Sequence, residues 1–197
     1  MLNQPSGIPA ATGDLPRLAI VCGLPATGKS TLARQLRDAL GWPAFSKDNF
    51  KEALFDGRNL DPTTLTRDQS KAIGGEALTM LFQVTRQTLE AGQPCIVEAN
   101  FLPQLAPMDF GPLTPLAALR QVHCVAPTSL VLARYRARAE SGMRHPVHSD
   151  AEAFAELQNR IDAGGGEPLS IAGELLQVDT TDGLQPNLAE ILTFLTR

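Results

Sequence analysis

The segment Gly23-Leu-Pro-Ala-Thr-Gly-Lys-Ser30 matches the phosphate-binding loop pattern G-x-x-x-x-G-K-[ST] at every required position. A short apolar run, Leu18–Cys22, precedes it, and a helical pattern with Leu32, Leu36 and Leu40 on one face follows it. The pattern requires this strand–loop–helix context, because the loop amides and the helix N-terminus must converge on one anion. The chain is therefore expected to fold as a parallel sheet with helices, and to bind a nucleoside triphosphate at the loop that follows its first strand.

The residue types of this loop predict how it holds the nucleotide. Gly23 and Gly28 let the backbone turn so that successive N–H groups point at phosphate oxygens. Lys29 is expected to contact the β- and γ-phosphates, and the Ser30 hydroxyl to ligate Mg²⁺. ATP and Mg²⁺ are therefore the predicted cofactors. The predicted nucleotide-binding residues of the loop are Gly23, Ala26, Thr27, Gly28, Lys29, Ser30 and Thr31.

Short apolar runs alternate with amphipathic segments along the rest of the chain, which is typical of a parallel sheet covered by helices on both faces. Further strands are expected at Pro43–Ser46, Cys95–Ala99, Gln121–Val125 and Leu175–Asp179. Helices are expected near 29–40, 48–56, 67–91, 128–141, 151–163 and 186–196. Four prolines between Pro103 and Pro115 predict that any helix there is short or irregular.

Composition limits the classes of partner. The 197 residues suit one domain, expected over 17–197 after a flexible tail at 1–16. A net charge of −4 argues against a general nucleic-acid binder, although a local basic groove stays open. No apolar run is long enough for a membrane helix. Three scattered cysteines and an N-terminus unlike a secretory signal predict reduced, buried thiols and a cytoplasmic location. The sequence does not indicate an oligomeric state.

Asp48 is the candidate for orienting the phosphoryl acceptor. It follows the second predicted strand in Ser46-Lys-Asp-Asn-Phe-Lys51, so it is expected at the carboxyl edge of the sheet, facing the γ-phosphate. There it could accept a proton from an attacking hydroxyl, while Lys51, one helical turn on, could hold the acceptor or the transferring phosphate. The alternative is that Asp48 is only the N-cap of the following helix.

Glu98 ends the third predicted strand, where a carboxylate can support Mg²⁺ through water. The alternative is a capping carboxylate at the rim of the sheet. Asn100, two residues on, is a candidate substrate contact or turn residue.

A basic cluster predicts a mobile cover over the phosphates. Arg134 and Arg138 lie at i and i+4 on one predicted helix, so they can converge on one anion. Arg144 follows after Ser141-Gly142, which would suit a hinge for a lid near 139–152. The alternative is a solvated basic face paired with nearby acids.

Two further segments carry weaker signals. His145-Pro-Val-His148 lacks a third metal ligand, so a structural turn is the first interpretation and substrate contact by His145 the second. Asp179-Thr180 ends the last predicted strand, where it is a candidate for contact with the nucleotide base.

Together these residues resemble the small P-loop kinases of the AAA-type ATP-binding group that includes phage-type polynucleotide kinase, chloramphenicol phosphotransferase and zeta toxins. In that group an S-x-D-x-x-[RK] stretch carries the catalytic base and a substrate cation, which correspond here to Ser46, Asp48 and Lys51. Lys51 replaces the arginine common in polynucleotide kinases, which weakens a bidentate phosphate grip.

The resemblance implies a P-loop NTPase three-layer sandwich with a parallel sheet of order 2-3-1-4-5 and a small helical lid. It implies a kinase that transfers the γ-phosphate of Mg–ATP to a hydroxyl of a small-molecule acceptor, with Lys29, Asp48, Arg134 and Arg138 as catalytic residues. A polynucleotide 5′-hydroxyl kinase and a regulatory ATP-binding module without kinase activity are the alternatives.

Overall fold

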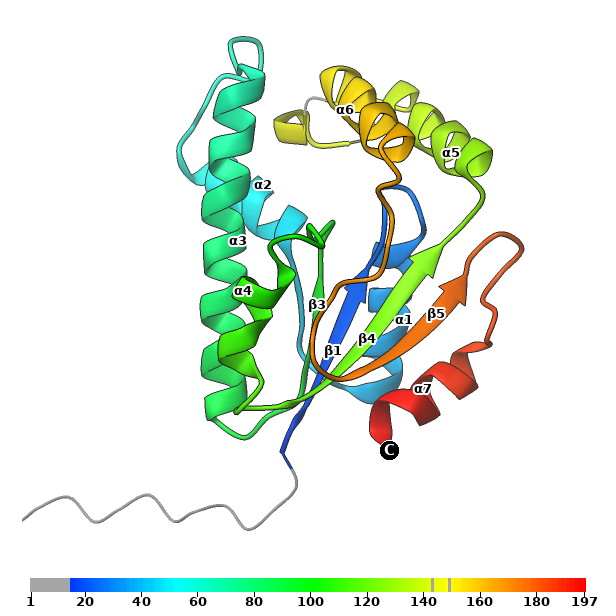
Figure 1. Ribbon diagram of the computed structural model, residues 1–197. Helices are drawn as coiled ribbons and strands as arrows, with labels where there is room; N and C mark the ends of the chain where they lie inside the picture. The colour runs from blue at the N-terminus through cyan, green and yellow to red at the C-terminus, as the bar shows by residue number, and fades with distance from the viewer. Residues whose placement is uncertain (1–14, 143, 149) are drawn as a thin grey trace, which may run out of the picture.

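The computed structural model describes residues 15–142, 144–148 and 150–197. Its centre is a five-stranded, all-parallel sheet of order β2-β3-β1-β4-β5 (Figure 1), which confirms the predicted strand order. The strands are β1 (Arg17–Cys22), β2 (Ala44–Ser46), β3 (Cys95–Glu98), β4 (Ala118–Val125) and β5 (Glu174–Asp179).

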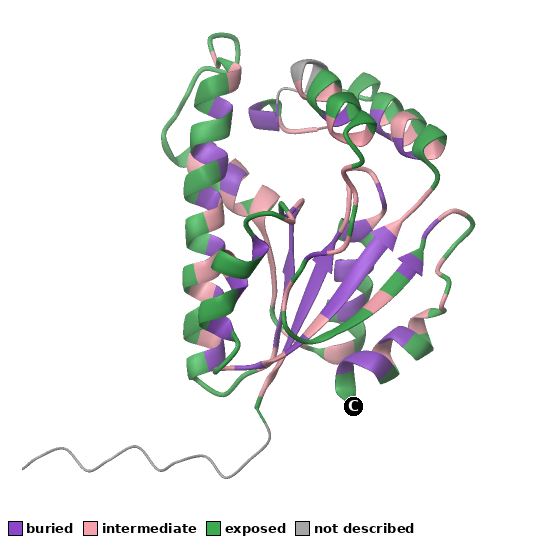
Figure 2. Cartoon of the chain, viewed as in Figure 1, coloured by how far each residue is buried: buried purple, intermediate pink, exposed green. Residues whose placement is uncertain are grey.

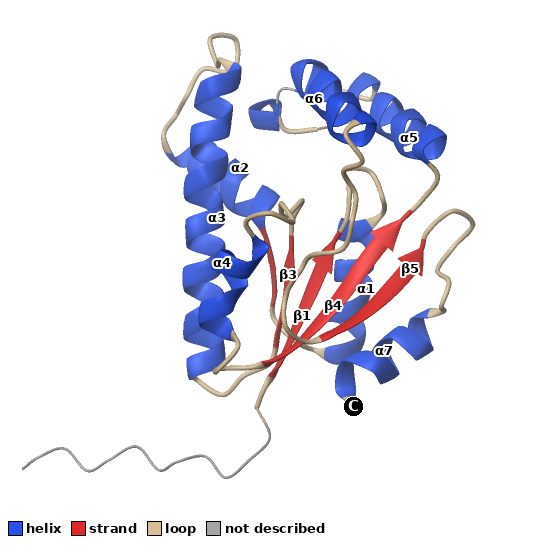
Figure 3. Ribbon diagram, in the orientation of Figure 1, coloured by secondary structure: helices blue, strands red, loops and turns tan. Residues whose placement is uncertain are grey.

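Helices cover both faces of the sheet and its carboxyl edge (Figure 3). The longer ones are α1 (Lys29–Leu40), α2 (Lys47–Gly57), α3 (Arg67–Glu90), α5 (Thr128–Glu140), α6 (Asp150–Asp162) and α7 (Leu188–Thr196). Short helical turns are α4 (Ala106–Phe110), η1 (Gly111–Leu113) and η2 (Pro146–His148). Helices α5 and α6 pack on each other above the carboxyl ends of the strands. They therefore cover the edge of the sheet where the phosphate loop follows β1.

The alternation of side chains along β1 divides the core into two layers. Leu18 and Ile20 pack with apolar residues of α3 and α4. Ala19 and Val21 pack with α1 and α7 on the opposite face. All four are fully buried, and Figure 2 shows the same burial along the central strands. A strand buried on both faces has no need of polar positions, which explains its continuous apolar sequence.

Most element boundaries lie within two residues of the sequence-based expectation, but the start of one strand and one helix cap differ from it. Strand β4 begins at Ala118, three residues before the expected Gln121, because its early residues pair with Arg17 and Leu18. The interpretation of Asp48 as a helix N-cap is wrong, since Ser46 occupies the N-cap of α2 and Asp48 lies in the first turn. The prolines of 103–115 limit α4 to five residues, as expected.

The cysteines Cys22, Cys95 and Cys124 are free and buried. Within the described part of the chain, no helix is long and apolar enough to cross a membrane. Residues 1–14 of the predicted tail, and positions 143 and 149 of the predicted lid, lie outside the described residues.

Candidate active site

The phosphate loop connects β1 to α1 through three residues with positive φ. Gly23 has φ 132°, and a Cβ at this position would lie 2.2 Å from the Cys124 carbonyl oxygen. Gly28 has φ 81° at the N-cap of α1. Ala26 adopts φ 64°, a conformation that costs a residue with a Cβ about 1 kcal/mol or more. Such strain is typical of a backbone shaped for a ligand.

Lys29 is buried at the start of α1, and its Nζ donates a hydrogen bond of 2.6 Å to the Leu24 carbonyl oxygen within the loop. Burial lowers the pKa of Lys29, and the nearby carboxylates of Glu98 and Asp48 oppose this effect. The lysine therefore lies among groups of opposite charge in a site that is screened from solvent.

Glu98 ends β3 beside the phosphate loop. Strand register places it opposite Val21 of β1 and Ser46 of β2. Its carboxylate accepts a hydrogen bond of 2.9 Å from the Ser46 hydroxyl, and Ser30 lines the same cavity. Burial raises the pKa of Glu98, whereas Lys29 lowers it.

The oxygens of Ser30 and Glu98 form the kind of hard donor set that Mg²⁺ prefers. Both side chains line the same cavity beside Lys29, so the residues fit the predicted metal. Among the described residues, no group of three or more His, Cys, Asp or Glu side chains gathers as a separate metal site.

Asp48 faces the same end of the sheet from the first turn of α2. Its Oδ2 accepts a hydrogen bond of 3.0 Å from Arg144, and its Oδ1 lies 4.0 Å from Nδ1 of His148. Burial raises the pKa of Asp48, but the basic groups around it, His148, Arg144 and Lys47, bring the pKa below its ordinary value. Asp48 is therefore ionised at neutral pH and able to accept a proton.

Lys51 lies one turn after Asp48 and is also buried. Its Nζ donates to the Ser70 hydroxyl at 2.7 Å, and that hydroxyl donates to the Val147 carbonyl oxygen at 2.6 Å. Burial and the neighbouring charge of Lys47 lower the pKa of Lys51 to about 8. Lys51 thus connects α2 to α3 and to the segment 144–148.

Arg134 and Arg138 both line the cavity described below. Arg134 donates hydrogen bonds to the carbonyl oxygens of Thr180, at 2.8 Å, and Thr181, at 3.1 Å. The Arg138 guanidinium lies over the Tyr135 ring, 4.9 Å from its centroid. Arg134 therefore joins α5 to the turn after β5 in addition to facing the cavity.

Replacing Arg134 by lysine is expected to lower the free energy of unfolding by about 1–2 kcal/mol, because a single ammonium cannot satisfy both carbonyl oxygens with the same geometry. ATP affinity should fall as well, since the Thr180 hydroxyl donates to the Thr27 carbonyl oxygen of the phosphate loop. Thermal melts and ATP titrations of Arg134→Lys and of the control Arg34→Lys, at an exposed position of α1, measure both effects. Equal behaviour of the two variants would contradict this role.

Segment 144–148 docks against α2 and α3. Val147 is fully buried beside Phe55 and Ile73. Three basic side chains of the segment face three acids of α2 that are spaced four residues apart. The contacts are Arg144 with Asp48 at 3.0 Å, His148 with Glu52 at 2.7 Å and His145 with Asp56 at 3.0 Å. The i, i+4, i+8 spacing of the acids was visible in the sequence, but their partners lie about 90 residues away.

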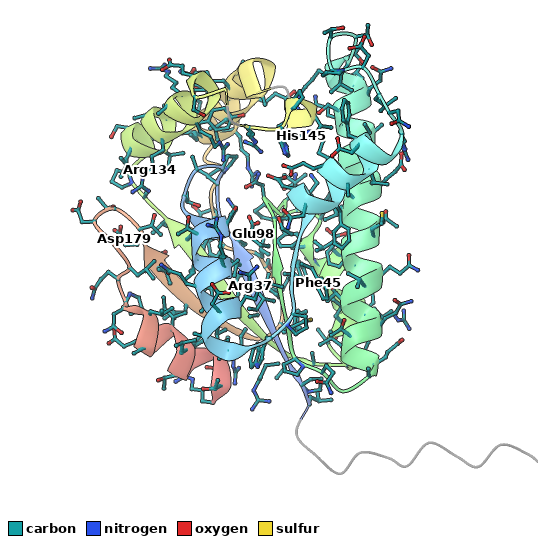
Figure 4. The ribbon with its side chains drawn as sticks, turned by 180° about the vertical axis from the view of Figure 1, so that it is seen from behind. Arg37, Phe45, Glu98, Arg134, His145 and Asp179 are labelled. Carbon is teal, nitrogen blue, oxygen red and sulfur yellow. The ribbon has the colours of Figure 1, made fainter. Side chains whose placement is uncertain are left out.

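Side chains of the phosphate loop, α1, α2, α5 and segment 144–148 line one cavity with a volume of about 650 Å³. Figure 4 shows Glu98 at the end of the sheet, with Arg134 and His145 on opposite sides of it. Twelve predicted site residues line the cavity: Ala26, Gly28, Lys29, Ser30, Thr31, Asp48, Lys51, Glu98, Asn100, Arg134, Arg138 and Arg144.

Five predicted site residues do not line this cavity. Gly23 and Thr27 shape the phosphate loop, and Thr180 braces it through the hydrogen bond to Thr27. Asp179 is exposed and accepts the Thr181 N–H at 2.7 Å, while His145 faces Asp56. Further residues that line the cavity without having been assigned to the site from the sequence include Lys47, Arg67, His148, Glu156 and Arg160. Lys47 and His148 belong to the two stretches Ser46–Lys51 and His145–His148, whereas the other three come from segments without a motif.

Comparison with known proteins agrees with this fold and loop. Residues 18–163 match the AAA domain family. A candidate kinase from Chloroflexus aurantiacus J-10-fl is 35% identical, with a TM-score of 0.79 over 92% of this chain and 97% of that one. No match was found among curated proteins.

More distant structures share the fold. A sugar kinase from Janibacter sp. HTCC2649 is 19% identical, with a TM-score of 0.59 over 91% of this chain and 94% of that chain. The APS kinase of Mycobacterium tuberculosis, in complex with AMPPNP and APS, is 16% identical, with a TM-score of 0.56 over 94% of this chain and 100% of that chain. The chain therefore belongs to the AAA domain family and has the fold of the P-loop kinases.

Proposed function

We propose that the protein is a kinase that transfers the γ-phosphate of Mg–ATP to a hydroxyl group of a small-molecule acceptor. One observation carries this proposal: a single cavity joins the phosphate-loop lysine Lys29 to the ionised carboxylate Asp48 on the facing helix. A nucleotide-binding loop alone would be sufficient for ATP hydrolysis or for signalling. A general base on the other side of the same cavity is expected where a second substrate must be deprotonated.

The proposed chemistry needs little covalent help from the protein. The acceptor oxygen forms a bond to the γ-phosphorus, the bond from that phosphorus to the β,γ-bridging oxygen breaks, and ADP leaves. Asp48 orients the hydroxyl and accepts its proton, while Lys29, Arg134 and Arg138 balance the negative charge of the phosphate oxygens. Mg²⁺, held by Ser30 with Glu98 beside it, would add positive charge at the same oxygens.

The acceptor end of the cavity favours a substrate that is itself negatively charged. Lys47, Lys51, Arg67 and Arg144 line this end from α2, α3 and segment 144–148. Two acids of the lining partly balance them, since Asp48 pairs with Arg144 and Glu156 with Arg67. Hydroxy compounds that carry a carboxylate or phosphate group are therefore the first acceptors to test. The 5′-hydroxyl of a polynucleotide is the second candidate acceptor, because the negatively charged phosphodiesters of the polynucleotide could bind the same cations.

The test is transfer of labelled γ-phosphate from Mg–ATP to a panel of neutral metabolites, anionic metabolites and 5′-hydroxyl oligonucleotides. We expect label in an anionic acceptor, with transfer lowered at least about 10³-fold in Lys29→Ala. Arg37→Ala removes an exposed cation from the same helix and serves as the control. Tight ATP binding without transfer to any acceptor would favour the regulatory module instead.

A further inference from the structure

His148 lies between two carboxylates of α2. Its Nε2 lies 2.7 Å from Oε1 of Glu52, and its Nδ1 lies 4.0 Å from Oδ1 of Asp48. The side chain is only 5% exposed, whereas Glu52 is 36% exposed. A continuous row of groups thus leads from the carboxylate that faces the phosphates, through a buried imidazole, to a carboxylate that reaches solvent.

The contact with Glu52 fixes the tautomer of His148. A carboxylate oxygen accepts hydrogen bonds, so Nε2 must carry the proton in this contact. Neutral His148 therefore presents the bare lone pair of Nδ1 to Asp48. His145 has the same tautomer, because its Nδ1 accepts the Val147 N–H at 3.2 Å while Nε2 faces Asp56.

The charges around His148 favour its neutral form. Burial lowers its pKa, and the positive charges of Arg144 and Lys51 act in the same direction. Asp48 and the hydrogen bond to Glu52 raise the pKa but do not compensate fully. Arg67 of α3 also packs here and donates to the His148 carbonyl oxygen at 3.3 Å. The imidazole is therefore neutral at neutral pH, and its Nδ1 lone pair is available to accept a proton.

Other contacts suffice to hold segment 144–148 in place. Val147 fills an apolar cluster with Phe55 and Ile73, and Ser70 bonds to its carbonyl oxygen. Arg67 donates a hydrogen bond to the backbone carbonyl oxygen of His148. The segment therefore has docking contacts besides the His148 ring, so a change in the ring can be tested without removing all of them.

We propose that His148, held by Glu52, accepts from Asp48 the proton that Asp48 removes from the acceptor hydroxyl. This inference rests on the proposed function. As the acceptor oxygen bonds to the γ-phosphorus, its proton moves to Asp48 Oδ1 and then to His148 Nδ1, while the Nε2 proton stays on the Glu52 contact. When the products leave the cavity, the imidazolium loses its Nδ1 proton to solvent, which restores the neutral ring with its proton on Nε2 and leaves Asp48 as the carboxylate.

The gap of 4.0 Å between Nδ1 and Oδ1 is about 1 Å longer than a hydrogen bond. Contacts of this kind often tighten only when both substrates are bound. His148 acts through Asp48 and not on the substrate, so it is a positioning residue. Its role requires a lone pair at Nδ1, a proton at Nε2 and a titratable ring.

NMR titration of the His148 ring in the ATP-bound protein tests the coupling. Asp48→Asn and Glu52→Gln should each lower the pKa of His148, because both acids favour the protonated ring. Asp56→Asn removes the matching acid–histidine contact one turn farther along α2 and should leave that pKa unchanged. The inference would be overturned if the pKa of His148 were the same in Asp48→Asn as in the wild-type protein.

The pH profile of phosphoryl transfer tests the proton step itself. The rate should fall as pH drops through the pKa of His148, and this acid limb should move to lower pH in Glu52→Gln. His148→Gln, which keeps an amide near Glu52 but cannot be protonated, should lower kcat about tenfold to 10²-fold and lose that limb. KM for ATP should stay unchanged.

The outcomes separate the two proposals. Normal kcat and an unchanged acid limb in His148→Gln would overturn the role of His148 and leave the kinase assignment standing. A wild-type protein that transfers phosphate to no acceptor would overturn the proposed function, and the proton step with it.

Discussion

Asp48→Asn should retain ATP binding and lower phosphoryl transfer by about 10²- to 10⁴-fold, the range typical for loss of a positioned general base. The amide keeps the size of the carboxylate but cannot accept the hydroxyl proton. Asp48 lies across the cavity from Lys29, so the nucleotide contacts of the phosphate loop stay intact. Isothermal titration with ATP and a transfer assay on the same sample separate binding from catalysis.

The control for this experiment is Asp56→Asn. Asp56 belongs to the same helix and faces a histidine of the same segment, but it does not line the cavity. It therefore reproduces the loss of one acid from α2 without touching the proposed chemistry. Equal rates for wild type and Asp48→Asn would remove Asp48 from the mechanism.

Gly23→Ala should destabilise the fold by at least about 3 kcal/mol and abolish ATP binding. Two effects add at this position. An alanine would adopt φ 132°, which side chains avoid, and its Cβ would lie 2.2 Å from the Cys124 carbonyl oxygen. That oxygen belongs to the end of β4, next to β1, so it cannot move without disturbing the sheet. Chemical denaturation and ATP titration measure the two losses.

Gly41→Ala separates the two effects. Gly41 also has a positive φ, 67°, at the end of α1, but no atom lies within 4 Å of a Cβ built there. This variant should lose only about 1 kcal/mol, the cost of the left-handed backbone conformation. Similar losses in both variants would show that the close approach to Cys124 is relieved by local movement.

Local sequence patterns predicted most of the elements. The apolar run Leu18–Cys22 is a central strand because it is buried on both faces. Helix α1 begins at Lys29, where the loop pattern places it. These features depend on residues near one another in the chain, so the sequence carries their full signal.

The nucleotide-binding end of the cavity could also be predicted from the sequence, because Lys29 and Ser30 belong to one continuous motif. Glu98 could be placed from its position at the end of a strand, since parallel strands end at one edge of the sheet. Asp48 and Lys51 could be placed beside them for the same reason.

The sequence by itself determined the sheet, the phosphate loop and the residues at the carboxyl ends of the strands, because strand periodicity and helix starts are local properties. Only the tertiary structure decided which groups face each other across the cavity. It paired Arg144 and His148 with acids of α2, joined Arg134 to the turn after β5, and turned His145 away towards Asp56. These contacts join segments about 45 to 100 residues apart, where packing and charge, and not local propensity, select the partner.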